Sequence, residues 1–115
     1  MHLQGDEPPD KQDVIATMQS YGVPVYVTEL DVNMARVEGT QEERYEKEAE
    51  IYRDMLAASL ESGVCRSFSV WGIQDKYSWL EAFSAQADAT MYDDYLRPKP
   101  AYYAIFDTLE QHVSP

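Results

Sequence analysis

The sequence predicts an α/β fold in which parallel strands alternate with helices. Helix-like segments, where apolar residues recur every three or four positions, alternate with short runs rich in β-branched and aromatic residues. Gly and Pro separate these segments. With 115 residues and 44% hydrophobic content, the chain has room for one modest packed domain. The expected order is helix, strand, helix, strand, helix.

The first helix and the first strand occupy the N-terminal third of the chain. Asp10 is a residue type that caps free helical amides, and Gly22 supplies a left-handed stop. A helix is therefore expected from about Lys11 to Tyr21. After Pro24, residues 25–32 are rich in β-branched and aromatic side chains on both faces, which indicates a strand covered on both sides.

The second half of the chain repeats this alternation. Apolar residues at helical spacing predict a helix from about Gln41 to Ser62, which Gly63 ends. Residues 65–71 read as a second strand, followed by a long polar and aromatic loop from Gly72 to about Lys99. Pro100 suits a first helical position, and an apolar face predicts a last helix to about His112.

Two kinds of sheet fit a strand, helix, strand unit of this length: an open doubly wound sheet and a closed barrel. No glycine-rich phosphate loop follows either strand, which removes the main reason to expect a dinucleotide-binding sheet. The barrel is therefore favoured by elimination.

Composition excludes several classes of function. Nine basic and twenty-one acidic residues give a net charge of -12, which disfavours nucleic acid and anionic membrane surfaces as partners. No apolar run approaches the roughly 18 to 20 residues that cross a bilayer, and residues 1–4 lack signal-peptide features, so neither an anchor nor an export signal is expected. Cys65, the single cysteine, excludes an internal disulfide and a cysteine zinc cluster, but leaves the compartment open. No cofactor is expected.

Two acids end the first strand. Because side chains alternate along a strand, one set should face a barrel interior and the other the helices. The expected inward set is Val25, Val27, Glu29 and Asp31, and the expected helix-facing set is Tyr26, Thr28, Leu30 and Val32. Glu29 would then emerge at the rim where barrel enzymes carry out catalysis. On the residues alone, a strand end that meets solvent remains the simpler interpretation, and a hard-cation site a weaker one.

Two tryptophans accompany the acids. Trp71 ends the second strand on the face it shares with Ser67 and Ser69, so its indole would stand at the same rim, and Trp79 follows in the loop. Flat aromatic faces pack against the C–H groups of pyranose rings, and acids bind their hydroxyls, so this combination suits a sugar. Ordinary core anchoring is an equally good interpretation of the two indoles from composition alone.

Three segments carry a resemblance to a known family. They are Val25-Tyr26-Val27-Thr28-Glu29-Leu30-Asp31-Val32, then Val70-Trp71-Gly72-Ile73 with Asp75 and Ser78-Trp79, then Pro98-Lys99-Pro100-Ala101-Tyr102-Tyr103-Ala104-Ile105. In this order and spacing they resemble the C-terminal part of family 10 glycoside hydrolases. The resemblance implies that residues 1–115 are the C-terminal part of the catalytic domain, a (β/α)8 TIM barrel, comprising the end of strand 6, helix 6, strand 7, helix 7, strand 8 and helix 8. It also implies a retaining endo-β-1,4-xylanase, with xylan or xylo-oligosaccharides as partners and secretion as the localisation.

The resemblance also implies roles for individual residues. Glu29 matches the nucleophile, and Met1-His2-Leu3 is similar to the end of the sixth strand, whose histidine binds the nucleophile. In this chain His2 would be held by Asp31. Trp71 and Trp79 would line the subsites next to the cleaved bond. Without the resemblance, a histidine at the second position is better interpreted as a frayed terminus or tag remnant.

The resemblance leaves part of the barrel unaccounted for. A TIM barrel needs about 250 residues, and the missing N-terminal strands bear the acid/base glutamate in the family. We therefore expect the chain to be inactive alone, with the rest of the barrel as its partner, and only marginally stable because its sheet edges are unpaired. The alternative is a non-catalytic module that binds xylo-oligosaccharides or another protein.

Overall fold

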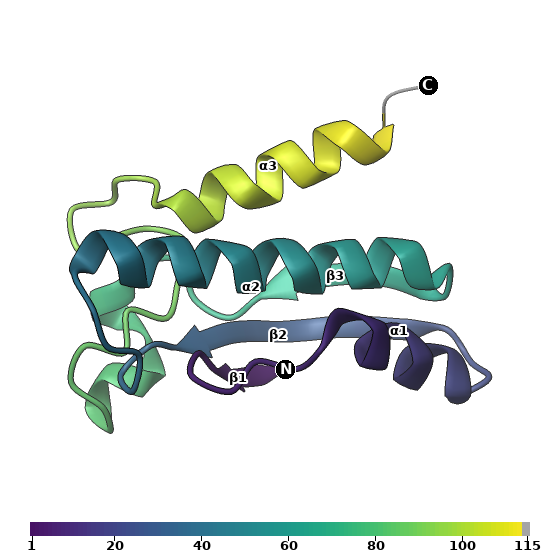
Figure 1. Ribbon diagram of the computed structural model, residues 1–115, viewed down its shortest axis with the longest axis horizontal. Coiled ribbons are helices and arrows are strands. Elements are labelled where there is room, and N and C mark those ends of the chain that lie inside the picture. Colours follow the sequence, from purple (N-terminus) through teal and green to yellow (C-terminus); the bar gives the residue numbers. More distant parts are fainter. Residues whose placement is uncertain (114–115) are drawn as a thin grey trace.

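The computed structural model describes residues 1–113 and places three α-helices against one face of a three-stranded sheet (Figure 1). The expected alternation of helices and strands is confirmed, and a short strand lies at the start, where the resemblance implied the end of a strand. The loop after the last strand contains two 3-10 helices, η1 and η2. The elements are β1 (His2–Gln4), α1 (Lys11–Ser20), β2 (Val25–Asn33), α2 (Gln41–Ser62), β3 (Cys65–Val70), η1 (Asp75–Tyr77), η2 (Trp79–Ala82) and α3 (Pro100–Val113).

The sheet is parallel throughout, in the order β1-β2-β3. β1 lies beside the C-terminal end of β2, with His2 opposite Asp31. β2 and β3 end on the same side of the molecule, where the loop of residues 72–98 lies (left in Figure 1). The carboxyl ends of the strands therefore meet one long loop, which is where α/β folds place their sites.

The helix boundaries follow the capping residues seen in the sequence. The Asp10 side chain accepts hydrogen bonds from the backbone amides of Gln12 and Asp13 at the start of α1. Thr40 and Glu43 form a reciprocal capping box at the start of α2. Gly63, with φ of 73°, ends α2 in the left-handed conformation that disfavours side chains with a Cβ.

The core lies between the sheet and the helices. Within the helical layer, α2 packs against both α1 and α3. The opposite face of the sheet is more open, and Tyr26 is 60% exposed there. No helix among residues 1–113 is both long and apolar enough to cross a bilayer. The buried apolar residues of the core are Met18, Val27, Leu30, Val32, Met34, Ile51, Tyr52, Met55 and Ala101.

The expected facing of the first half of β2 is wrong. Val27, expected to face a barrel interior with Glu29, packs instead in the same core as Leu30, and Val25 packs against that core too. The cause is a bulge: between the paired positions Val27–Phe68 and Leu30–Val70, two residues of β2 lie opposite one residue of β3. The extra residue reverses the alternation, so the side chains that precede the bulge lie on the opposite face from the one expected.

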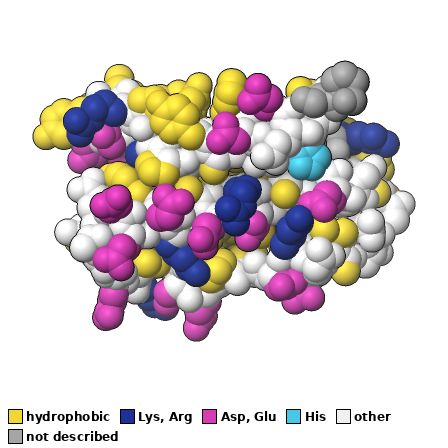
Figure 2. Space-filling model, turned by 45° about the horizontal axis from the view of Figure 1, so that its top comes forward, with side chains coloured by type: hydrophobic (Ala, Val, Ile, Leu, Met, Phe, Trp, Pro, Cys, Tyr) yellow, Lys and Arg dark blue, Asp and Glu magenta, His cyan; other side chains and the backbone are white. Residues whose placement is uncertain are grey.

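The surface carries both signs of charge. On the face drawn in Figure 2, acidic side chains are spread among basic ones rather than separated from them. A chain with a net charge of -12 therefore distributes its excess of acids over the helices instead of concentrating it in one patch of this face.

Candidate active site

Four side chains meet at the C-terminal end of β2. His2 lies between two carboxylates: its Nδ1 is 2.8 Å from Oδ1 of Asp31, and its Nε2 is 3.1 Å from Oε1 of Glu29. The indole Nε1–H of Trp79 donates to the other oxygen of Asp31, at 2.7 Å. The parallel pairing of β1 with β2 places His2 opposite Asp31. Glu29 lies within the bulge of β2 and Asp31 follows it, and both acids reach the same imidazole ring.

The two contacts of His2 constrain the proton on its ring. An ionised carboxylate only accepts hydrogen bonds, so two such contacts require N–H on both ring nitrogens, which is the imidazolium form. A neutral ring would donate to one carboxylate and face the other with a lone pair. The geometry places one ring nitrogen against each acid, so His2 links Asp31 to Glu29.

Burial separates the two acids. The Asp31 side chain is 0% exposed and occupied by His2 and Trp79, whereas the Glu29 side chain is 40% exposed. Asp31 can orient the imidazole but cannot reach a ligand, and Glu29 can. Because Asp31 is buried, both acids cannot hold one cation, and residues 1–113 contain no group of three or more His, Cys, Asp or Glu side chains that is arranged to hold a metal ion.

Trp71 and Trp79 are nearly half-exposed, and Phe83, which contacts Trp79, is 77% exposed. The rings of Trp79 and His2 meet edge to face at 5.4 Å, and Phe83 packs edge to face on Trp79 at 5.8 Å. The backbone amide of Trp71 donates to the carbonyl of Leu30, beside Glu29, and within residues 1–113 its indole makes no hydrogen bond or ring contact. Sequence reasoning missed Phe83, although its position four residues after Trp79 in an aromatic loop was a usable signal.

Comparison with known proteins identifies the family. The model of glycosyl hydrolase family 10 matches residues 1–108. The chain belongs to glycosyl hydrolase family 10. It is 33% identical over 93 residues to endo-1,4-beta-xylanase B of Thermotoga neapolitana, covering 80% of this chain and 27% of that protein. It is 32% identical over 110 residues to an endo-1,4-beta-xylanase of Agaricus bisporus, covering 95% of this chain and 32% of that protein.

Solved family 10 xylanases superimpose on nearly the whole chain. Xylanase 10B of Thermotoga petrophila, crystallised with xylobiose, has a TM-score of 0.87 at 28% identity and covers 99% of this chain. Endo-1,4-beta-xylanase XylE of Penicillium canescens also has a TM-score of 0.87, at 35% identity and 96% coverage. This chain spans 36% and 34% of those two structures. The predictions of the family and of an α/β part of its TIM barrel are therefore confirmed.

Sequence reasoning also missed a buried ionic cluster behind this site. Nζ of Lys99 lies 2.7 Å from Oε1 of Glu48 and 3.0 Å from Oδ2 of Asp75, and donates to the carbonyls of Asp88 and Thr90 at 2.8 Å each. These contacts join the start of α3 to α2 and to the loop that carries Trp79. In the sequence, Lys99 stands out only as part of the family signature. Sequence alone does not reveal which lysine is buried.

Burial sets the protonation behaviour of this cluster. Desolvation raises the pKa of Glu48 well above its usual value, against the attraction of Lys99. Desolvation likewise raises the pKa of Asp75, despite hydrogen bonds from Thr90 and Lys99. Burial opposes the charge on Lys99, but the attraction of Glu48 and Asp75 outweighs it and raises the pKa of the ammonium. One buried cation thus faces two acids, and Oε2 of Glu48 has no hydrogen-bond partner within residues 1–113.

Proposed function

We propose that this chain supplies the nucleophile side of the active site of a retaining endo-β-1,4-xylanase, with Glu29 as the nucleophile. The observation that carries the proposal is the shared imidazole: Glu29 and Asp31 contact opposite nitrogens of His2, and Glu29 is the exposed acid of the two. In a retaining mechanism a carboxylate attacks the anomeric carbon to form a glycosyl-enzyme, and a second acid about 5 to 5.5 Å away protonates the leaving oxygen.

His2 and Asp31 support the nucleophile. A ring N–H pointed at Glu29 stabilises its ionised form, which is the form that attacks. Asp31 fixes the ring from the other side, because it is buried and its second oxygen is held by Trp79. The pair therefore orients the Glu29 carboxylate without contacting the sugar.

Trp71 and Trp79 supply flat apolar faces for xylose units on either side of Glu29. Both indoles are nearly half-exposed at the end of the sheet where the proposed nucleophile stands. The relatives are named endo-1,4-beta-xylanases, and a structure similar to this chain was solved with xylobiose, so xylan or xylo-oligosaccharides are the proposed substrates.

The proposed place in the barrel explains what the chain lacks. We assign β1 to the end of strand 6, α1 to helix 6, β2 to strand 7, α2 to helix 7, β3 to strand 8 and α3 to helix 8, within one partial catalytic domain of residues 1–115. Asp31 is buried and cannot protonate a leaving oxygen, so the acid/base carboxylate comes from the remainder of a family 10 domain. The chain alone should therefore not turn over xylan.

Covalent trapping tests the nucleophile. We use a complete barrel, meaning these residues within a full-length family 10 domain, treat it with a mechanism-based fluoro-xylobioside, and map the label by peptide mass spectrometry. Glu29 should carry the label, and Glu29→Gln should abolish labelling while Glu46→Gln, an exposed change on α2, leaves it intact. The isolated chain should label poorly. A label on any other residue refutes the assignment.

The second candidate function is a sugar-binding module without turnover. It is favoured by one observation, that the indoles of Trp71 and Trp79 are nearly half-exposed and could bind xylose rings without the Glu29 carboxylate. Calorimetric titration of the chain with xylo-oligosaccharides separates the two functions. A binding module should lose affinity on Trp71→Ala and Trp79→Ala and be unaffected by Glu29→Ala, with no label at Glu29 in the complete barrel.

A further inference from the structure

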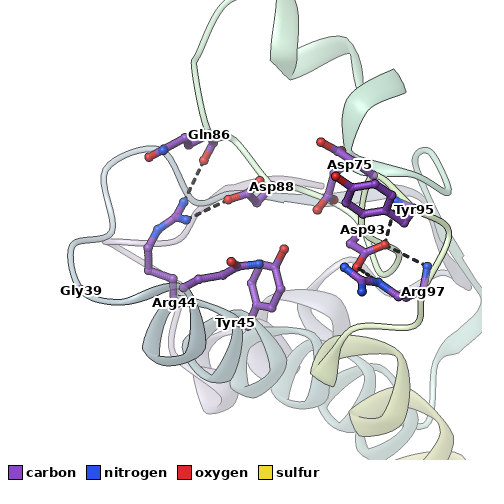
Figure 3. Close-up of a pocket in the computed structure, with 11 residues that line it drawn as sticks. Gly39, Arg44, Tyr45, Asp75, Gln86, Asp88, Asp93, Tyr95 and Arg97 are labelled. Carbon is purple, nitrogen blue, oxygen red and sulfur yellow. Dashed lines mark hydrogen bonds and ion pairs between the residues drawn. The ribbon is translucent and has the colours of Figure 1, made fainter.

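Arg44, in the first turn of α2, is nearly buried and joins two loops that are distant in sequence. Its Nε donates to the carbonyl of Val37 at 3.0 Å, and Nη2 donates to the carbonyl of Met34, also at 3.0 Å. On the other side, Nη2 donates to the carbonyl of Gln86 and Nη1 to Oδ2 of Asp88, both at 2.8 Å. Arg44 lines a cavity of about 340 Å³. Figure 3 shows its guanidinium at one edge of this cavity, pointing towards Gln86 and Asp88.

The loop of residues 84–89 is held in an unfavourable backbone conformation. Gln86 has φ of 58° and Asp88 has φ of 42°, the left-handed region that residues with a Cβ seldom occupy. Residues in this conformation are strained and persist only where the surroundings hold them. Arg44 contacts both, so it is well placed to hold this conformation.

The same loop packs on the residue that follows Trp79. Ala87 and Ala89 are both fully buried and form a small apolar cluster with Leu80. Between the two alanines, the amide of Asp88 donates to Oε1 of Glu81 at 3.3 Å. A shift of this loop would therefore move the 3-10 turn that begins at Trp79.

We propose that Arg44 is a positioning residue for Trp79, which forms one wall of the proposed sugar-binding site. Arg44 holds the loop of residues 84–89, and this loop keeps the indole of Trp79 hydrogen-bonded to Asp31. The inference rests on the proposed function only in the role given to Trp79. Arg44 does not contact the nucleophile or the sugar. Its effect passes through Leu80 and Glu81 to the indole N–H, which lies 2.7 Å from Oδ2 of Asp31.

Nuclear magnetic resonance of the indole groups tests this in the complete barrel. With ¹⁵N-labelled tryptophan, Trp71→Phe and Trp79→Phe identify the two relevant indole N–H signals. Arg44→Ala should shift the Trp79 signal and speed its exchange with solvent on the order of tenfold, because its hydrogen bond to Asp31 opens more often. The Trp71 signal should stay in place.

Three further variants keep the test decisive. Arg44→Lys retains the charge but cannot form the four hydrogen bonds of the planar fork, so it should give an intermediate shift even if Arg44→Ala fails to fold. Arg53→Ala, an exposed arginine on the same helix that pairs with its neighbour Asp54, is the matched control and should leave both signals unchanged. Gln86→Gly, which relieves the strained φ, should partly restore the Trp79 signal in the Arg44→Ala background.

Kinetics distinguish failure of this inference from failure of the proposed function. Arg44→Ala should raise KM for xylo-oligosaccharides several-fold more than it lowers kcat, because it disturbs a binding wall rather than Glu29. An unchanged Trp79 signal in a folded Arg44→Ala or Arg44→Lys barrel overturns the inference, whatever Glu29 does. A barrel in which Glu29 is not labelled but the Trp79 signal shifts refutes the nucleophile and leaves the positioning role supported.

Discussion

Lys99→Met removes the cation from the buried cluster and keeps a side chain of similar length. The ammonium contacts two carboxylates and two carbonyls, and the side chain is 1% exposed, so solvent cannot replace it. Removing one partner of a buried ion pair costs about 3 to 5 kcal/mol, because the remaining charge is left uncompensated. We expect a loss of this size in the free energy of unfolding at pH 7.

Because the isolated chain is expected to be only marginally stable, this loss is measured in the complete barrel, by urea titration followed by far-UV circular dichroism. At pH 5 the loss should be smaller, because the pKa values of Glu48 and Asp75 are raised and the two acids take up protons more readily once Lys99 is gone. Lys47→Met, an exposed lysine on α2, is the matched control and should change stability by less than about 0.5 kcal/mol. A Lys99→Met protein within 1 kcal/mol of the unchanged chain at pH 7 would refute the reasoning.

The remaining predictions concern stability. The stability of Glu48→Gln relative to the unchanged protein should increase as the pH rises above 4.5, the usual pKa of glutamate. The reason is that burial raises the pKa of Glu48, so ionising this carboxyl costs the unchanged protein stability. Urea titrations from pH 4.5 to 8 measure the two free energies of unfolding, and a fall of the Glu48→Gln value relative to that of the unchanged protein would contradict this. Gly5→Ala should destabilise by about 1 to 3 kcal/mol, because the new Cβ would lie 2.5 Å from the sulfur of Met34. Tyr52→Phe should cost about 1 kcal/mol in urea unfolding, since its buried hydroxyl donates to the carbonyl of Ala89 at 2.6 Å. The isolated chain should melt without a cooperative transition well above room temperature, and a calorimetric scan with one would count against its marginal stability.

The local elements could be read from the sequence because their signals are local. Asp10, Thr40 and Gly63 mark helix ends through side-chain capping or permitted φ, so both bounds of α2 and the start of α1 agree with expectation. The candidate site was also accessible from the sequence: a Glu and an Asp two positions apart in a strand share a face. The meeting of His2 with both acids was foreseen only through the family resemblance, because it depends on pairing between strands.

Tertiary structure decided the features that depend on contacts between distant segments. The bulge in β2 follows from pairing with β3, and no pattern in residues 25–32 distinguishes it from a regular strand. The burial of Lys99 and Arg44 depends on loops folding over them, and a charged residue in sequence looks the same on a surface or in a core. The register of strand pairing and the packing of the loops determine which of the many charged side chains are buried away from water, and neither can be read from a local stretch of sequence.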